Sequence, residues 1–221
     1  MYLLIFDLDG TLIDSKLDLA HSVNATRTFM GMDPLEHELV YSYVGNGAPV
    51  LIRRALGGAA TETDVERALE FFIRYYAQHC LDYTVLYPGV QAALDRLHGA
   101  GHSLAVLTNK PVKISHRILD GLGLSEHFFR VYGGNSFDRK KPDPVGIATL
   151  LAESGLEPAR TYMVGDSAVD IETARNAGVR SCGVSYGFQP EAMMEASPDV
   201  VVDDLDLFAR ALLDVKSLDV K

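Results

Sequence analysis

The spacing of apolar and polar residues divides the chain into segments of two kinds. A short apolar run over residues 2–6 has the length of a buried strand and ends in a polar turn at Gly10. Over residues 14–84 the apolar positions recur at helical spacing, and no convincing strand interrupts them. Beyond residue 85, short apolar runs alternate with amphipathic stretches, which is typical of parallel strands joined by helices.

The segment over residues 14–84 predicts amphipathic helices. One begins at Ser15 and continues toward Met30, after which a glycine and a proline end it, and another covers residues 50–56. A longer helix begins at an N-cap region over residues 61–64 and carries aromatic residues at helical spacing. We interpret these aromatic side chains as core residues rather than as a stacking platform for a ligand: Phe71, Phe72, Tyr75 and Tyr76.

The alternating segment predicts an α/β sheet. Strands are expected at residues 103–107, 128–132, 161–164, 180–184 and 200–202, and helices at 90–98, 112–119, 145–153, 171–177 and 204–215. The first strand is of the same type, so we expect residues 1–13 and 85–221 to form one core with a doubly wound parallel sheet. Residues 14–84 are then an inserted α-helical cap, which its position in the chain places over the strand ends as a lid.

Composition and charge narrow the possible functions. With 221 residues, 48% of them hydrophobic, the chain is expected to be a soluble globular protein, monomeric or homodimeric. Its net charge of −10 argues against a nucleic-acid partner. Cys80 and Cys182 lack a metal-binding spacing and read as reduced thiols. No apolar run reaches the roughly 18 residues of a membrane span, and no signal-peptide pattern is present, so a cytoplasmic location without a membrane partner is expected.

Two carboxylates follow the first strand, at the sheet edge where ligands bind in open α/β folds. On a regular strand the side chains of Asp7 and Asp9 would share one face, where bare carboxylates repel each other. A hard divalent cation between them is the simplest source of the missing positive charge. An acidic turn with solvated aspartates explains this short stretch equally well.

The other predicted strand ends and a basic loop carry residues suited to a phosphate ester. They bring Thr108 and Asn109, then Lys141, then Asp166 and Asp170. Each also has a purely structural interpretation, since Thr108 or Asp166 can cap a helix and Lys141 can be a solvated loop charge. Asp170 can be a first-turn residue that the helix dipole favours. Their joint occurrence at one edge of the sheet favours a site for a phosphoryl group and Mg²⁺.

The chain resembles the haloacid dehalogenase superfamily of phosphohydrolases over residues 1–14 and 85–190. The family's D-x-D-x-T motif is matched here by Asp7, Asp9 and Thr11, and the later motifs by Thr108, by Lys141, and by Gly165, Asp166, Ser167 and Asp170. The helical insert resembles the family's α-helical cap. Within the family, residues 6–15 and 44–47 are most similar to bacterial phosphoglycolate phosphatases.

The resemblance implies an Mg²⁺-dependent hydrolysis of a small phosphorylated metabolite through an aspartyl-phosphate. Asp7 would be the nucleophile, and Asp9 the general acid and then the general base. The metal would be held by Asp7, Asp166, Asp170 and the backbone carbonyl of Asp9. The phosphoryl oxygens would be held by Thr108, Asn109 and Lys141. The leading substrate is 2-phosphoglycolate.

Other activities of this family remain open. The substrate could be a sugar phosphate, a nucleotide or pyrophosphate, and a β-phosphoglucomutase-like phosphomutase would use the same core. A dehalogenase would not need Asp9, and a phosphonatase would need a cap lysine where the insert has only Lys16. An alternative that is not an enzyme is a regulator that binds a phosphorylated metabolite without catalysis. An acidic substrate would need hydrogen-bond donors or a cation from the cap, such as the backbone amides of residues 45–47, Arg53 or Arg54. The two arginines are explained more simply as residues on a solvated helix face.

Overall fold

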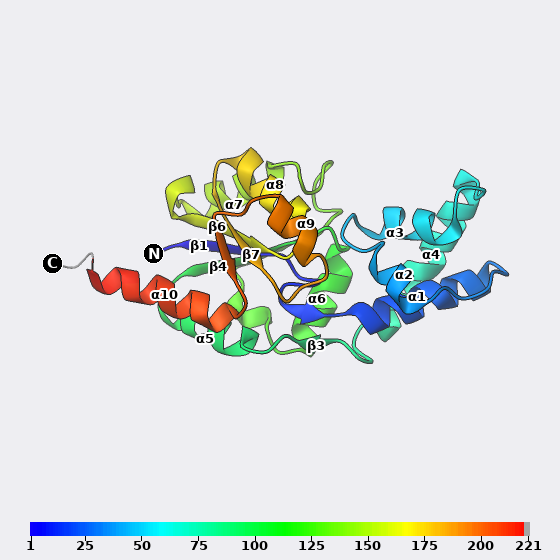
Figure 1. Cartoon of the computed structure of the whole chain (residues 1–221), viewed down its shortest axis with the longest axis horizontal. Helices are drawn as coiled ribbons and strands as arrows, with labels where there is room; N and C mark the ends of the chain where they lie inside the picture. Colours follow the sequence, from blue (N-terminus) through cyan, green and yellow to red (C-terminus); the bar gives the residue numbers. More distant parts are fainter. Residues whose placement is uncertain (219–221) are drawn as a thin grey trace.

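The molecule is built on a parallel sheet that lies at the centre of its larger part (Figure 1). This computed structural model describes residues 1–218, and the last three residues of the expected core lie outside it. Among the described residues six strands pair in the order β5-β4-β1-β6-β7-β8, all of them parallel. They are β1 (Leu3–Phe6), β4 (Ser103–Leu107), β5 (Arg130–Tyr132), β6 (Thr161–Gly165), β7 (Arg180–Val184) and β8 (Val200–Val202). The predicted α/β fold is confirmed.

Helices cover both faces of the sheet because its central strand is apolar on both sides. Leu4 and Phe6 of β1 belong to one buried cluster, which includes residues of α5 (Val90–Gly99), α6 (Val112–Gly121) and α10 (Leu205–Leu218). Leu3 and Ile5 belong to a second cluster with residues of α7 (Val145–Ser154) and α8 (Ala168–Ala177), on the opposite face in Figure 1. Each such buried side chain contributes about 2 kcal/mol, which fixes the face it takes.

The helical segment projects from one end of this sheet. It consists of α1 (Lys16–Phe29), α2 (His37–Tyr41), α3 (Ala48–Leu56) and α4 (Glu62–His79), and lies at the right of Figure 1. The chain enters and leaves it through a two-stranded antiparallel ribbon of β2 (Ile13–Asp14) and β3 (Val85–Leu86). The sequence did not predict this ribbon, because two-residue strands are too short to show a period.

The structure also differs from the prediction in several short elements. It contains α2, α9 (Pro190–Glu195) and the 3₁₀ turns η1 (Ser125–His127) and η2 (Pro158–Arg160), none of which was expected. Single turns of helix carry too few residues for an amphipathic pattern. Of the aromatic residues on α4, Phe72 and Tyr76 are buried as predicted. Phe71 and Tyr75 are only half-buried and stack on each other, with their ring centroids 5.8 Å apart.

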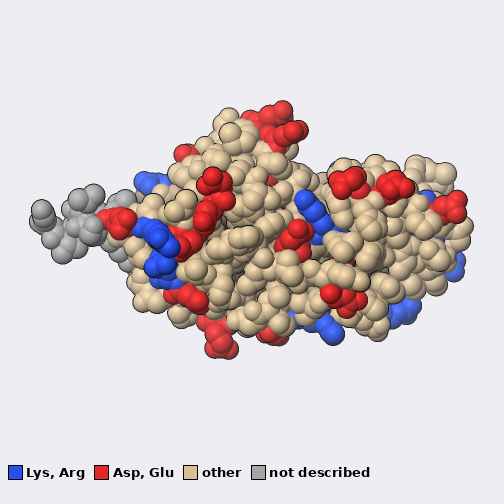
Figure 2. All heavy atoms as spheres, turned by 60° about the horizontal axis from the view of Figure 1, so that its bottom comes forward, with Lys and Arg blue, Asp and Glu red and all other residues tan. Residues whose placement is uncertain are grey.

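The surface shown in Figure 2 carries acidic and basic side chains in small separate groups. Acidic residues outnumber basic ones, 30 to 20, so no broad basic face is to be expected. Cys80 and Cys182 are buried and form no disulfide with each other. Every helix within residues 1–218 is too short or too polar to cross a membrane.

Candidate active site

The turn after β1 holds Asp7 and Asp9 apart. The Asp7 N–H still donates to the Val164 carbonyl of β6 at 2.9 Å, but the chain then folds back so that the Gly10 N–H donates to Ile13 O. Gly10 has a φ of 80°, and a side chain there would overlap the Asp166 carboxylate. Only glycine fits this close approach in that backbone conformation. Since this stretch is a turn, the strand rule that placed both carboxylates on one face does not apply.

Three carboxylates meet at the carboxyl ends of β1 and β6. Asp7, Asp166 and Asp170 each offer an oxygen, and these oxygens lie within 4.8 Å of one another. Asp166 and Asp170 are buried, with 2% and 0% of their surface exposed. Burial raises the pKa of Asp7 to about 6, with Lys141 opposing the shift and Asp170 adding to it. Burial, Asp170 and Asp7 raise the pKa of Asp166 well above its usual range.

This cluster fits a divalent cation. Burial first, and repulsion between the carboxylates second, disfavour the charged forms of Asp7 and Asp166 and raise their pKa values. Oxygen ligands from a few carboxylates are what Mg²⁺ takes in proteins, with water and phosphate completing its shell. The side chain of Asp9 lies outside the cluster.

Lys141 joins the cluster from the loop that follows β5. Its Nζ lies 3.0 Å from Asp7 Oδ1 and donates to Asp170 Oδ1 at 2.6 Å. Burial lowers the pKa of Lys141, but the attraction of Asp170 and Asp7 outweighs it and the pKa ends above its ordinary value. The structure therefore places this lysine as a buried cation beside Asp7, and its solvated-loop interpretation was wrong.

Asp170 contacts both Ser167 and Lys141, so it caps a helix and also belongs to the site. One oxygen, Oδ2, accepts from the Ser167 N–H at 3.1 Å and from Ser167 Oγ at 2.6 Å, which forms a capping box at the start of α8. The other oxygen faces Lys141. The cap holds the carboxylate rigidly in the cluster, so helix stability and site geometry depend on the same residue.

Thr108 and Asn109 follow β4 and line the same cavity as Asp7. Both are buried. The Asn109 side-chain amide donates to Lys141 O at 3.2 Å and to Gly45 O at 3.3 Å. Thr108 does not cap α6, whose N-cap is Pro111. Its hydroxyl accepts instead from the Lys110 N–H at 3.3 Å, which shapes the turn after the strand.

Asp9 faces Lys110, which was not among the predicted site residues. Lys110 Nζ donates to Asp9 Oδ1 and Oδ2 at 2.8 and 2.9 Å, and Ser15 Oγ donates to Oδ1 at 2.5 Å. The same ammonium lies 2.5 Å from the hydroxyl of Tyr76 on α4. Tyr76 thus does more than fill the core. The position of Lys110 directly after the strand end was the one available signal.

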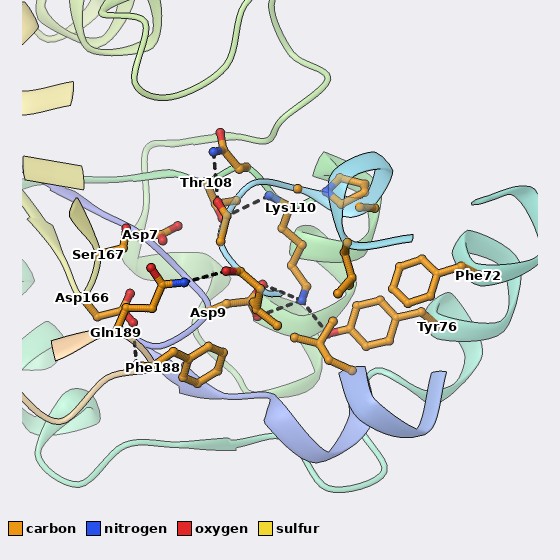
Figure 3. A pocket seen from close by; sticks show the side chains of 18 residues that line it. Asp7, Asp9, Phe72, Tyr76, Thr108, Lys110, Asp166, Ser167, Phe188 and Gln189 are labelled. Atoms are coloured by element: carbon orange, nitrogen blue, oxygen red, sulfur yellow. Dashed lines mark hydrogen bonds and ion pairs between the residues drawn. The ribbon is translucent and has the colours of Figure 1, made fainter. Parts of the chain in front are cut away.

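The cavity above these residues lies between the sheet edge and the helical segment (Figure 3). The space between its walls that no atom fills, including space open to solvent, amounts to about 620 Å³. Apolar side chains form its helical side, among them Leu19, Leu51 and Phe72. Arg53 and Arg54 do not line it: exposed Arg53 pairs with Glu62, and Arg54 donates to Tyr43 O.

The loop over residues 44–47 closes one wall of the cavity through its carbonyls. Val44 O accepts from Gln189 Nε2 at 2.6 Å, and Asn46 O accepts from Lys140 Nζ at 2.6 Å. Together with the bond from Asn109 to Gly45, these contacts hold the loop against the sheet edge. The use of the backbone amides of residues 45–47 for an acidic ligand stays a prediction, while the carbonyl oxygens of this loop bind the core.

The chain is similar to known proteins over nearly all of its length. The family model described as haloacid dehalogenase-like hydrolase matches residues 4–184. A phosphoglycolate phosphatase of Pseudomonas fluorescens is 41% identical over 219 residues, which cover 96% of this chain and 80% of that protein. One of Vibrio parahaemolyticus is also 41% identical, with 92% of each protein covered. A crystal structure of a predicted phosphoglycolate phosphatase from Haemophilus somnus has a TM-score of 0.90 and 34% identity, covering 96% of this chain and 98% of that one.

Proposed function

The chain belongs to the haloacid dehalogenase-like hydrolases and is a phosphatase. From this premise we propose that it hydrolyses 2-phosphoglycolate to glycolate and phosphate through an aspartyl-phosphate, with Mg²⁺ as cofactor. The observation that carries the proposal is the ammonium of Lys141 held between Asp7 and Asp170 at the sheet edge. Such a buried cation beside a carboxylate lets that carboxylate approach a phosphate dianion.

Asp7 is the nucleophile in this proposal. One of its oxygens attacks the phosphorus atom, the ester bond to the leaving oxygen breaks, and a covalent acyl phosphate forms. Lys141 offsets the charge of Asp7 and of the phosphoryl oxygens, while Thr108 and Asn109 supply a hydroxyl and an amide beside them. The raised pKa of Asp7 requires that it lose its proton before it attacks.

Asp7, Asp166 and Asp170 would hold the Mg²⁺, with the backbone carbonyl of Asp9 as a further ligand. Bound there, the ion would withdraw negative charge from the phosphoryl oxygens. Asp170 contributes from its place in the capping box, whether it binds the ion itself or through water.

Asp9 is the general acid and base. To act as the acid Asp9 must first take up a proton, which it then gives to the leaving oxygen; the resulting carboxylate takes a proton from the water that attacks the acyl phosphate. Phosphate leaves, and Asp7 and Asp9 return to their starting states. The ion pair with Lys110 and the bond from Ser15 keep the Asp9 side chain apart from the metal cluster, on the side of the leaving group.

Two observations support 2-phosphoglycolate as the substrate. Relatives at 41% identity carry the name phosphoglycolate phosphatase. The cavity is small and partly walled by Phe72, Leu19 and Leu51, so it suits a short leaving group. Sugar phosphates, nucleotides and pyrophosphate are the competing substrates.

The proposal is tested by phosphate release from 2-phosphoglycolate and from this panel of competitors, with Mg²⁺ and with excess EDTA. We expect kcat/KM for 2-phosphoglycolate to exceed the others by about 100-fold or more, and EDTA to stop the reaction. A better substrate in the panel would overturn the assignment of 2-phosphoglycolate. Full activity in EDTA would overturn the role of the metal.

A further inference from the structure

A buried cation lines the cavity on the side where the leaving group must lie. Of the described residues around the cavity, Lys110 is the only one with a cationic side chain. Its side chain is 3% exposed, and its ammonium is shared between Asp9 and the hydroxyl of Tyr76. None of the roles assigned above to the phosphoryl group, the metal or the nucleophile uses this charge.

The order of residues along the cavity places Lys110 beyond the ester oxygen. Figure 3 shows Asp7, then Asp9, then the Lys110 ammonium and Tyr76 in succession across the site. If the phosphorus atom is bound at Asp7 and the leaving oxygen at Asp9, the next atoms of the leaving group point toward Lys110. Its Nζ is in direct contact with Asp9, 2.8 Å from Oδ1, so a short leaving group whose ester oxygen lies at Asp9 has its tail beside the ammonium.

The surroundings of Lys110 make it selective for an anionic tail. The remaining walls there are apolar or aromatic, including Phe72, Leu19 and Leu51, and exclude water from the ammonium. In such a setting a charge-assisted bond to a carboxylate is short and strong, whereas a neutral tail leaves the cation with Asp9 alone. The arginines of the helical segment cannot take this role, since they lie outside the cavity.

Tyr76 links this recognition to the helical segment. Its hydroxyl comes from α4 and lies 2.5 Å from the Lys110 ammonium. The ammonium also lies 4.4 Å from the centroid of the Tyr76 ring, which adds a cation–π attraction. Lys110 itself comes from the sheet side, after β4. A carboxylate bound here therefore contacts both parts of the molecule at once.

We propose that Lys110, assisted by the Tyr76 hydroxyl, binds the carboxylate of the substrate and so determines the preference for an acidic leaving group. This inference rests on the proposed function, whose substrate carries such a carboxylate. Lys110 is then a specificity-determining residue, distinct from the phosphate-binding Lys141.

The test uses two phosphonates that cannot be hydrolysed and that differ only in the tail. 3-Phosphonopropionate has the carboxylate of 2-phosphoglycolate, and propylphosphonate has a methyl group instead. Their dissociation constants are measured by calorimetry with Mg²⁺ for the wild type, Lys110→Met and Lys113→Met. Lys113 is exposed on α6 and provides the same chemical change outside the site.

We expect the wild type and Lys113→Met to bind 3-phosphonopropionate roughly 10- to 100-fold more tightly than propylphosphonate. In Lys110→Met this ratio should fall to within about 3-fold, with binding of propylphosphonate nearly unchanged. An equal loss of affinity for both compounds would show that Lys110 only supports the site. Lys110→Gln, which keeps a polar side chain, gives the same comparison if the methionine variant does not fold.

The binding ratio also separates this inference from the proposed function. If the wild type hydrolyses another phosphomonoester best but still prefers 3-phosphonopropionate through Lys110, the substrate assignment fails and the inference stands. A wild type that binds the two phosphonates equally overturns the inference, whatever its best substrate is.

Discussion

At the scale of single residues, the site contains two lysines that pair with different aspartates and are proposed to have different roles. Lys141 contacts Asp7 and Asp170, where the phosphoryl group and the metal are proposed to bind. Lys110 contacts Asp9, where the leaving group is proposed to lie. The two carboxylates are only two positions apart in the chain, and the turn at Gly10 directs them to different cations.

Asp7→Asn should abolish turnover, because the amide cannot attack the phosphorus atom. We expect kcat to fall by about 10⁴-fold or more while the circular dichroism spectrum stays unchanged. Asp33→Asn, at an exposed position in the loop that follows α1, is the matched control and should keep full activity. Steady-state turnover of Asp7→Asn near the wild-type rate would contradict the role of nucleophile.

Asp9→Asn should affect substrates according to their leaving groups. Alkyl phosphates need a proton on the departing oxygen, so their kcat/KM should fall by about 10³-fold. 4-Nitrophenyl phosphate has a stable anionic leaving group and should lose about 10-fold or less. Measuring both esters on one preparation gives the comparison, and equal losses would argue against Asp9 as the general acid.

At the scale of elements, helix termini place and secure the site. The capping box of α8 holds Asp170 beside Lys141. A second capping box, between Thr61 and Asp64, starts α4, the helix that brings Tyr76 to Lys110. The two boxes use the same chemistry, but only the first lies at the active site.

The α4 box therefore allows helix stability to be separated from catalysis. Thr61→Ala removes the hydroxyl that accepts from the Asp64 N–H at 3.2 Å, and should lower the free energy of unfolding by about 1 kcal/mol. Thr63→Ala makes the same change inside the first turn at an exposed position and should not destabilise the protein. Urea denaturation measures both. Neither variant should change kcat at 25 °C, and a large loss in Thr61→Ala would mean that the start of α4 controls the site.

At the scale of the whole molecule, the carboxylate cluster couples metal binding to stability and pH. Asp7 and Asp166 have raised pKa values, so in the metal-free folded state they keep protons that the unfolded chain releases near pH 4. Their contribution to stability is therefore present at low pH and is lost as pH rises through about 6 for Asp7. A bound cation would compensate for that loss.

Mg²⁺ should accordingly raise the melting temperature more at pH 7.5 than at pH 5. At pH 5 the ion must displace protons from Asp7 and Asp166, which weakens binding. Differential scanning fluorimetry with and without 5–10 mM Mg²⁺, roughly the range for a weak site, measures the shift at each pH. Asp7→Asn should reduce the shift and Asp33→Asn should not. Equal shifts at the two pH values would contradict this assignment of the metal site.

The sequence carried most of the fold because the signals for it are local. Apolar runs and glycine stops predicted the strands and the helices joining them, and the order of types predicted a parallel sheet. The elements that escaped prediction, such as the β2–β3 ribbon and α9, are too short to display a period. Their existence depends on the partner segments that the fold brings to them.

For the candidate site, the sequence alone determined which residue types stand at the strand ends, including Asp7, Thr108 and Asp166. Only the tertiary structure decided how they pair. The contact of Lys110 with Asp9 spans 101 positions in the chain and that with Tyr76 spans 34. No local pattern encodes such distant contacts: the first arises because β1 and β4 lie side by side in the sheet, and the second because α4 brings Tyr76 to that sheet edge. The charge facing the leaving group is therefore a property of the folded molecule.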